Sequence, residues 1–299
     1  MRESGCYVSG CGMEAGMLEN AKEREQLTQG VDVSKYQGEI DWEKVKASGI
    51  DFVIVRASYG WSAGQTDPTF ARNAAGAQAA GLAVGAYHYS YAKTVEEARK
   101  EAELFYHTIR DKKLDMPVYL DLEDPGQAGL GKAALTEIAA AFCSYLEERK
   151  YFVGIYANLN WLENKLDLDR LPYTVWLARW AAAPGYGGSF GLWQFSSKGQ
   201  VDGIDGLVDL DACYQDFPTL IRRAGLNGFG EGEGGETGDA GGGESGGEVN
   251  IIVRCRCRGW TREITGQRRG NTIYAPARQL GEALGCQVVW QDGQVFVYG

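Results

Sequence analysis

Short apolar runs alternate with amphipathic stretches along the first three-quarters of the chain. The runs fall at residues 31–36, 51–58, 83–90, 117–123, 151–158, 174–180, 190–197 and 207–214. Between several of them, apolar residues recur at helical spacing, over 41–49, 67–81, 94–111 and 132–150. Strands that alternate with helices in this way predict an α/β fold, a parallel (β/α) TIM-like barrel. Because the stretches between the last runs are too short for full helices, we expect an irregular barrel on that side.

A change of composition divides the chain. Residues 225–248 consist mainly of Gly and Glu, cannot bury apolar surface, and therefore predict a flexible linker. In this scheme residues 29–224 form the barrel and residues 1–28 are a polar N-terminal lead-in. Residues 249–299 follow the linker and predict a small α+β C-terminal domain.

Composition narrows the classes of function. The net charge of -10 and the pI near 4.9 argue against a nucleic-acid partner. The sequence contains no apolar run of the roughly eighteen residues that a transmembrane helix requires, so we expect no membrane insertion. Seven irregularly spaced cysteines, with no Cys-x-x-Cys pair and only two histidines, argue against a zinc site. We expect neither a metal nor an organic cofactor.

The stretch PVYLDLED (117–124) places acidic residues at the end of an apolar strand. Side chains alternate along a strand, so Tyr119, Asp121 and Glu123 share one face and aliphatic residues share the other. In a barrel the aliphatic face packs against helices, and the other face points into the lumen. The two acids therefore lie near the carboxyl end of the strand, where barrels of this type carry their active sites.

The same alternation brings further groups to this cavity. Asp32 lies on the first run, and Asp209 and Asp211 lie on the last. Aromatic residues that alternation places with them are Tyr87, Tyr89, Trp176, Trp180, Trp193 and Phe195. Carboxylates beside aromatic rings suit glycosidic bond cleavage, in which one acid protonates the leaving oxygen and another stabilises positive charge. His88 and His107 have no suitable partners for a serine triad; we expect His88 to face the helices and His107 to lie at the surface.

Seven segments occur in a specific order along the chain. They are GVDVSKYQGEIDW (30–42), FVIVRASYG (52–60), GAYHYSY (85–91), PVYLDLED (117–124), GIYAN (154–158), WLARW (176–180) and LWQFSSKGQVDGIDGLVDLD (192–211). Together they resemble glycoside hydrolase family 25, the lysozymes of the Chalaropsis type, which include autolysins and phage endolysins. The resemblance implies a muramidase that cleaves the β-1,4 bond between N-acetylmuramic acid and N-acetylglucosamine in bacterial peptidoglycan.

The resemblance also implies roles for individual side chains. Glu123 matches the proton donor and Asp121 the partner carboxylate, which would orient the substrate's own 2-acetamido group as that group attacks the anomeric carbon. Asp32 and Asp209 match further active-site carboxylates. Sugar-contacting or cleft-lining positions are Tyr36, Tyr59, Tyr87, Tyr89, Tyr156, Trp180 and Trp193. The spacing of the two strand acids does not by itself distinguish a retaining from an inverting reaction.

Two other functions remain open from the residues. One is a barrel that binds peptidoglycan without cleaving it, and the presence of Asp32, Asp121, Glu123 and Asp209 argues against it. The other is a chitinase-like glycosidase that uses the same acetamido chemistry. The acidic strand pattern of that class, DxxDxDxE, is absent here.

The C-terminal part carries seven Arg and no Lys between residues 249 and 299. Its pattern predicts strands, a helix near 276–284 and a hairpin around Asp292 and Gly293. About thirty residues of it resemble one repeat of the copper amine oxidase N-terminal-like (stalk) module, which carries no catalytic copper. Two roles fit: binding of anionic wall polymers through Arg side chains, and packing or dimerisation.

The substrate implied by the resemblance lies outside the cell membrane, yet residues 1–28 lack the apolar core of a signal peptide. One explanation is a phage endolysin that is synthesised in the cytoplasm and then released. The other is a secreted bacterial enzyme whose start site is set too early, with Met13 and Met17 as alternative starts.

Overall fold

The computed structural model describes residues 28–230 and five strands between residues 248 and 298. The chain divides into two compact units, residues 1–235 and 236–299. In the described residues, no helix combines the length and the apolar character that crossing a membrane requires.

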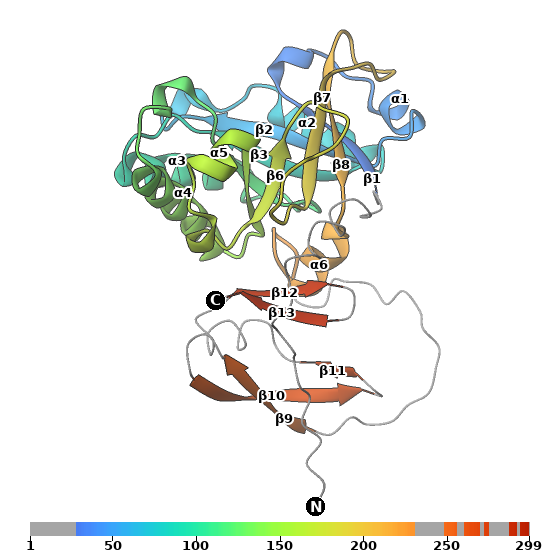
Figure 1. Cartoon of the computed structure of the whole chain (residues 1–299). Helices are drawn as coiled ribbons and strands as arrows, with labels where there is room; N and C mark the ends of the chain where they lie inside the picture. Colours follow the sequence, from blue (N-terminus) through green and yellow to red (C-terminus); the bar gives the residue numbers. More distant parts are fainter. Residues whose placement is uncertain are drawn as a thin grey trace, which may run out of the picture. The chain divides into compact units, whose positions relative to one another are not determined.

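Eight strands of the first unit close into a barrel, in which each strand lies beside its neighbours in sequence (Figure 1). In chain order they are β1 (Thr28–Val33), β2 (Phe52–Tyr59), β3 (Ala83–Tyr89), β4 (Val118–Asp121), β5 (Val153–Asn158), β6 (Thr174–Ala178), β7 (Leu192–Gly199) and β8 (Val208–Cys213). The predicted α/β class and the eight strands of the barrel are confirmed.

The direction of the last strand corrects the expectation of a fully parallel barrel. Each pairing from β1 through to β7 is parallel, whereas β8 runs antiparallel to both β7 and β1. The reason is the length of the connection. Only residues 200–207 link β7 to β8, and a parallel crossover needs about a dozen residues or more. The predicted irregularity on this side is present, since the chain forms no helix between β6 and β8.

The helices cover the outside of the barrel. They are α1 (Trp42–Ala47), α2 (Phe70–Ala79), α3 (Val95–Ile109), α4 (Lys132–Glu147), α5 (Leu159–Asn164) and α6 (Phe217–Ala224), with 3-10 turns η1 (Lys35–Gln37), η2 (Ala63–Gln65), η3 (Pro125–Gln127) and η4 (Leu168–Arg170). Helix α3 begins where the Thr94 side chain accepts a hydrogen bond from the Glu97 amide, as an N-cap does. Helices α3 and α4 lie side by side (Figure 1). Between them, the rings of Phe105 and Phe142 are stacked with their centroids 5.8 Å apart.

Apolar residues fill both faces of the barrel wall. The outward side chains of the strands pack with the helices in one buried cluster that includes Val53, Val118 and Leu120. A second cluster, which includes Tyr119 and Trp176, contains inward side chains and fills the lumen below the site. The centroids of these two rings lie 5.1 Å apart. Side chains therefore fill the interior of the barrel below the cavity.

The two histidines lie where the pattern predicts them. His88 is fully buried on the helix side of β3, and its Nδ1 lies 2.8 Å from the hydroxyl oxygen of Ser58. Its ring packs against Phe105 and Phe142. His107 lies on α3 with its side chain half exposed. Neither residue lines the cavity described below.

Residues just after α6 belong to the barrel, so the predicted linker starts too early. Asn227 is fully buried and has a positive φ of 54°, which Asn tolerates better than most residues. Its side-chain amide donates to the carbonyl oxygens of Leu114 (3.1 Å) and Met116 (2.9 Å) and accepts from the amide of Phe152 (2.7 Å). These bonds attach the segment after α6 to the residues just before β4 and β5.

The described strands of the second unit form two antiparallel sheets. Strands β9 (Glu248–Cys255), β10 (Trp260–Arg269) and β11 (Thr272–Tyr274) form a sheet in the order β11-β10-β9, and β12 (Gln287–Gln291) pairs with β13 (Gln294–Tyr298). The predicted lead-in, residues 231–247 of the predicted linker, the helix at 276–284 and the turn at Asp292 and Gly293 lie outside the described residues.

Candidate active site

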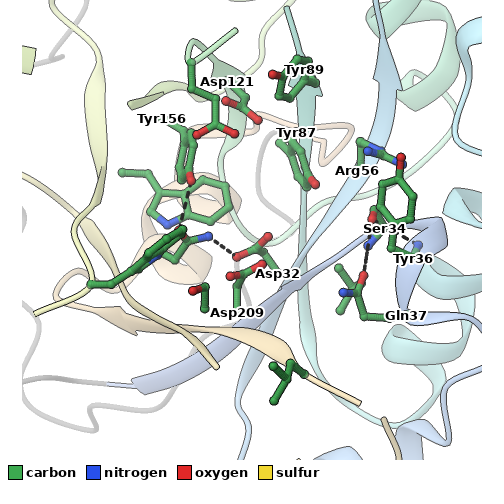
Figure 2. A pocket seen from close by; sticks show the side chains of 17 residues that line it. Asp32, Ser34, Tyr36, Gln37, Arg56, Tyr87, Tyr89, Asp121, Tyr156 and Asp209 are labelled. Atoms are coloured by element: carbon green, nitrogen blue, oxygen red, sulfur yellow. Dashed lines mark hydrogen bonds between the residues drawn. The ribbon is translucent and has the colours of Figure 1, made fainter. Parts of the chain in front are cut away.

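The carboxyl ends of the parallel strands open onto a cavity of about 460 Å³ (Figure 2). Of the residues that the sequence placed at one site, ten line this cavity: Asp32, Asp121, Glu123, Asp209, Tyr36, Tyr87, Tyr89, Tyr156, Trp176 and Trp180. They come from six strands and from the segments that follow them. Closing the sheet into a barrel therefore gathers acids that lie far apart in sequence.

Strand β4 brings Asp121 and Glu123 to the cavity. Asp121 is the last residue of β4 and is paired in register with Tyr89 on β3 and Tyr156 on β5. Glu123 follows two residues later and is half buried, while the aliphatic residues between and before them pack outward. The alternation predicted for this strand thus holds in the structure.

The other two cavity acids, Asp32 and Asp209, are paired in register across β1 and β8. Figure 2 shows their side chains next to each other, with Asp121 on the other side of the cavity. Asp32 is buried, and its Oδ2 accepts a hydrogen bond of 2.7 Å from the side-chain amide of Gln194. Two pairs of acids therefore face one another across the space that a substrate would enter.

Burial and mutual repulsion favour protonated acids in this cavity. Burial, together with the charge of Asp209, raises the pKa of Glu123, although a hydrogen bond with Tyr156 opposes the shift. The pKa of Asp121 is raised by burial and by the charge of Glu123, and the Arg56 guanidinium opposes that rise. Burial raises the pKa of Asp209 as well. A carboxyl group with a raised pKa can act as a general acid near neutral pH.

Arg56 provides the positive charge of the cavity, alone among the described residues that line it. Its Nε donates to Oδ2 of Asp67 at 2.8 Å, which holds the side chain in place. The guanidinium carbon lies 5.1 Å from the ring centroid of Tyr36 and 5.5 Å from that of Tyr59. A fixed cation at this distance from aromatic faces is stabilised by the ring electrons.

Aromatic side chains edge the cavity and leave ring surface open to solvent. Tyr36 is 75% exposed and Trp180 is 64% exposed, although a large ring without a binding role is more often covered. The Trp180 Nε1 and the Tyr156 hydroxyl both donate to Oε1 of Gln194, each at 3.0 Å. The Trp180 ring, which is exposed and held by a hydrogen bond, is therefore suited to stacking on a sugar ring.

Two predicted cleft residues of β7 lie outside the cavity. Trp193 faces the outer core, where its Nε1 donates to the backbone oxygen of Arg179 at 2.8 Å. The inward positions of β7 are Leu192 and Gln194 instead, so the predicted alternation of this strand was wrong by one residue. Phe195 likewise packs against the outer core.

Tyr59 does not line the cavity. It lies at the end of β2 and packs edge to face against Tyr91, with ring centroids 6.4 Å apart. The ring belongs to the support around Arg56 rather than to the cavity surface.

Sequence reasoning missed Arg56 and Gln194, which line the cavity together with Ser34 and Gln37. A signal existed for both. Arg56 interrupts the apolar run 51–58, and Gln194 interrupts the run 190–197. A polar side chain inside a buried strand requires a hydrogen-bonding partner. Such partners are available at the carboxyl end of a barrel, where the site lies. In the described part of the chain, no group of three or more metal-ligating side chains is arranged to hold an ion.

Comparisons with known proteins agree with this geometry. The profile of the family described as glycosyl hydrolases family 25 matches residues 31–204. The autolytic lysozyme of Clostridium acetobutylicum is 31% identical over 185 residues, which are 61% of this chain and 54% of that protein. The chain therefore spans only about half the length of this relative.

Solved structures are similar over the same region. The CTP1L endolysin superposes with a TM-score of 0.59 at 28% identity, over 65% of this chain and 69% of that one. The bacterial lysozyme from Streptomyces coelicolor superposes with a TM-score of 0.55 at 26% identity, over 66% of this chain and 96% of that one. With a match over more than half of its length, the chain belongs to glycosyl hydrolases family 25.

Proposed function

We propose that the chain is a muramidase, which hydrolyses the β-1,4 bond between N-acetylmuramic acid and N-acetylglucosamine in peptidoglycan. The observation that supports this most directly is the meeting of Glu123 and Asp121 with Asp32 and Asp209 at one cavity. Family membership and the likeness to an autolytic lysozyme and an endolysin support the same substrate class.

In the first step, Glu123 donates its proton to the oxygen that leaves the anomeric carbon. Its pKa is raised by burial and by Asp209, which favours the protonated form that a proton donor requires. As the glycosidic bond breaks, positive charge develops on the sugar ring. The carboxylates around the cavity stabilise that charge because they lie in a partly buried site of low dielectric.

In the same step, Asp121 acts on the substrate's own 2-acetamido group. The amide oxygen forms a bond to the anomeric carbon as the glycosidic bond breaks, and Asp121 accepts the amide N–H and stabilises the resulting positive charge. Water subsequently attacks the anomeric carbon, giving its proton to Glu123 and releasing the amide. The configuration of the sugar is retained, and Glu123 regains its proton.

Tyr156 can stabilise Glu123 once the proton has left. Its hydroxyl donates to Oε1 of Gln194 at 3.0 Å and also lies within hydrogen-bonding reach of Glu123. Trp180 donates to the same oxygen of Gln194. Tyr156 can therefore turn its proton toward the Glu123 carboxylate without leaving the Gln194 carbonyl unsatisfied.

The proposal is tested by mass spectrometry of the products from whole peptidoglycan. A muramidase leaves muramic acid at the new reducing ends. Absence of products would instead indicate a binding barrel, and glucosamine ends or cleaved chitin would indicate a chitinase-like enzyme. Glu123→Gln is expected to lower turnover by about 10²- to 10⁴-fold with the fold intact. Glu103→Gln, at an exposed position of α3, is the control, and equal turnover of the two variants would remove Glu123 from its role.

We further propose that the protein acts on the extracellular cell wall, as a released endolysin or as a secreted enzyme. The Arg-rich residues 249–299 carry a net positive charge, seven Arg against three acids, and the wall contains anionic polymers. Charge complementarity therefore supports a wall-binding role for the second unit.

A further inference from the structure

The proton donor proposed above lies near the start of a loop that is mostly exposed. Residues 122–131 connect β4 to α4, and we call them the donor loop. From Glu123 to Gly131, Gln127 is the only buried residue, and it is completely inaccessible to solvent. Gln127 does not line the cavity, and the reaction outlined above makes no use of it. A buried amide in an exposed loop marks the point where the loop is attached to the barrel.

The Gln127 side chain bonds to the segment that follows β3. Its Nε2 donates to the backbone oxygen of Ala92 at 2.7 Å and to Oγ of Ser90 at 3.2 Å. A backbone carbonyl only accepts, so the nitrogen of the amide must be the atom that faces Ala92. The Oε1 of Gln127 then has no hydrogen-bonding partner among the described residues. An unpaired buried acceptor costs about 1–3 kcal/mol, so stability alone is a poor explanation for an amide at this position.

The segment that receives Gln127 also holds the end of β4. The backbone amide of Ser90 donates to the backbone oxygen of Asp121 at 3.0 Å. Glu123 therefore lies between two points of the chain, Asp121 and Gln127, that are both bonded to residues 90–92. The position of its carboxyl group relative to that of Asp121 depends on both attachments.

Glu101 of α3 holds this segment from the outside of the barrel. Its Oε1 accepts from the Tyr91 amide at 2.8 Å, and its Oε2 accepts from the Ser90 hydroxyl at 2.6 Å. The shorter distance is typical of a hydroxyl that donates to a carboxylate. Because the Ser90 proton is directed at Glu101, its lone pairs are free to accept from Gln127. Glu101, Ser90 and Gln127 are all completely buried, so a solvent-free series of bonds connects α3 to the donor loop.

We propose that Gln127 is a positioning residue: it attaches the donor loop to residues 90–92 and so fixes the Glu123 carboxyl group relative to Asp121 for the reaction. The inference rests on the muramidase function proposed above. A misplacement of about 1 Å in a reacting group can lower a rate by about 100-fold. Without the Gln127 bonds, Asp124 still accepts a longer bond of 3.3 Å from the Tyr89 hydroxyl. The donor loop would therefore stay near the barrel but lose its fixed position.

The kinetic test is Gln127→Met, which keeps an unbranched side chain of similar size but cannot donate. We expect kcat to fall by about 10- to 100-fold, with KM changed by less than about threefold. Gln78→Met is the matched control, because the exposed Gln78 amide also donates to a backbone oxygen, that of Lys113 at 2.6 Å, and does not line the cavity. Wild-type kcat in folded Gln127→Met, or an equal loss in Gln78→Met, would overturn the proposal.

The pH profile separates positioning from a general loss of stability. Burial and the charges of Asp209 and Asp124 raise the pKa of Glu123, and the hydrogen bond with Tyr156 opposes the rise. A donor loop that moves admits water to Glu123, so this pKa should fall toward its ordinary value. The alkaline limb of the profile should therefore move to lower pH in Gln127→Met. A lower kcat with an unchanged alkaline limb would leave Gln127 a structural role alone and refute the positioning role.

Hydrogen exchange measured by mass spectrometry tests the attachment without requiring turnover. The amides of residues 122–131 should exchange faster in Gln127→Met than in the wild type and in Gln78→Met, and equal exchange would refute the attachment. If Gln127→Met does not fold, Gln127→Asn takes its place, since its amide is one methylene too short to reach both acceptors, and the same three results are expected. If the wild type releases no muramic acid ends, the muramidase function fails, and hydrogen exchange then decides the attachment by itself.

Discussion

Gln194 and Trp193 are adjacent in sequence, yet their side chains lie on opposite faces of β7. Gln194 holds Asp32 through its amide and accepts from Tyr156 and Trp180. Trp193 lies on the outer face of the same strand. Replacing each residue in turn therefore tests whether Gln194 faces the cavity and Trp193 faces the outer core. The two substitutions are Gln194→Leu and Trp193→Phe.

The magnitude follows from the bonds that each substitution removes. Gln194→Leu removes the 2.7 Å hydrogen bond to the Asp32 carboxylate. Bonds to charged groups contribute about 1.5–3 kcal/mol, which corresponds to roughly 10- to 150-fold in rate. The pKa of Asp32, which burial and the charges of Asp211 and Asp209 already raise, should rise further because the bond that lowers it is lost. The acid limb of the pH–rate profile should consequently move to higher pH.

Trp193→Phe removes only the bond from Nε1 to the backbone oxygen of Arg179 and keeps an aromatic ring in the outer core. We expect this variant to lose about 1 kcal/mol of stability and to keep its activity. Release of reducing ends from purified cell walls measures kcat/KM, and thermal denaturation shows that both variants are folded. The reasoning is refuted if Gln194→Leu retains wild-type kcat/KM, or if Trp193→Phe loses as much activity as Gln194→Leu.

Three further predictions concern proton supply, the barrel boundary and the second unit. Activity should fall as pH rises through the raised pKa of Glu123, because the acid must be protonated to donate; a rate still rising above about pH 8 would contradict this. Asn227→Ala removes three buried hydrogen bonds and should lower the free energy of unfolding by about 3–5 kcal/mol. Calorimetry should then show a melting temperature lower by roughly 2–4 °C per kcal/mol, with the exposed Asn160→Ala unchanged. Deleting residues 231–299 should leave turnover of soluble glycan fragments intact but reduce sedimentation with purified cell walls, and unchanged sedimentation would exclude wall binding by the second unit.

The local pattern of apolar and polar residues was sufficient to predict the eight strands, the long helices and the inward direction of Asp121 and Glu123. The reason is that charge is tolerated on a buried strand only where the barrel opens. An acid at the carboxyl end of β4 therefore has a single compatible orientation. The same reasoning correctly brings Asp32 and Asp209 to the mouth, since each alternates with aliphatic residues that pack outward.

On β7 the pattern is ambiguous, because both faces of the barrel wall are apolar. Leu192 packs in the lumen and Trp193 packs in the outer core, so hydrophobicity alone does not say which of them faces inward. The pairing of β7 with β6 and β8 decides this, and it turns Gln194 toward Asp32. Burial of Asn227 is likewise invisible in a Gly-rich stretch, since its partners are backbone groups of distant strands.

The amino-acid sequence by itself determined the elements, the family resemblance and the acids at the cavity, because these depend on composition and on the two-residue period of a strand. Only the tertiary structure decided the antiparallel direction of β8, the presence of Gln194 rather than Trp193 at the cavity, and the hydrogen bond between Gln194 and Asp32. Each of these depends on which strands are neighbours and in what register. That information arises only when the barrel closes and strands distant in sequence become hydrogen-bonded partners.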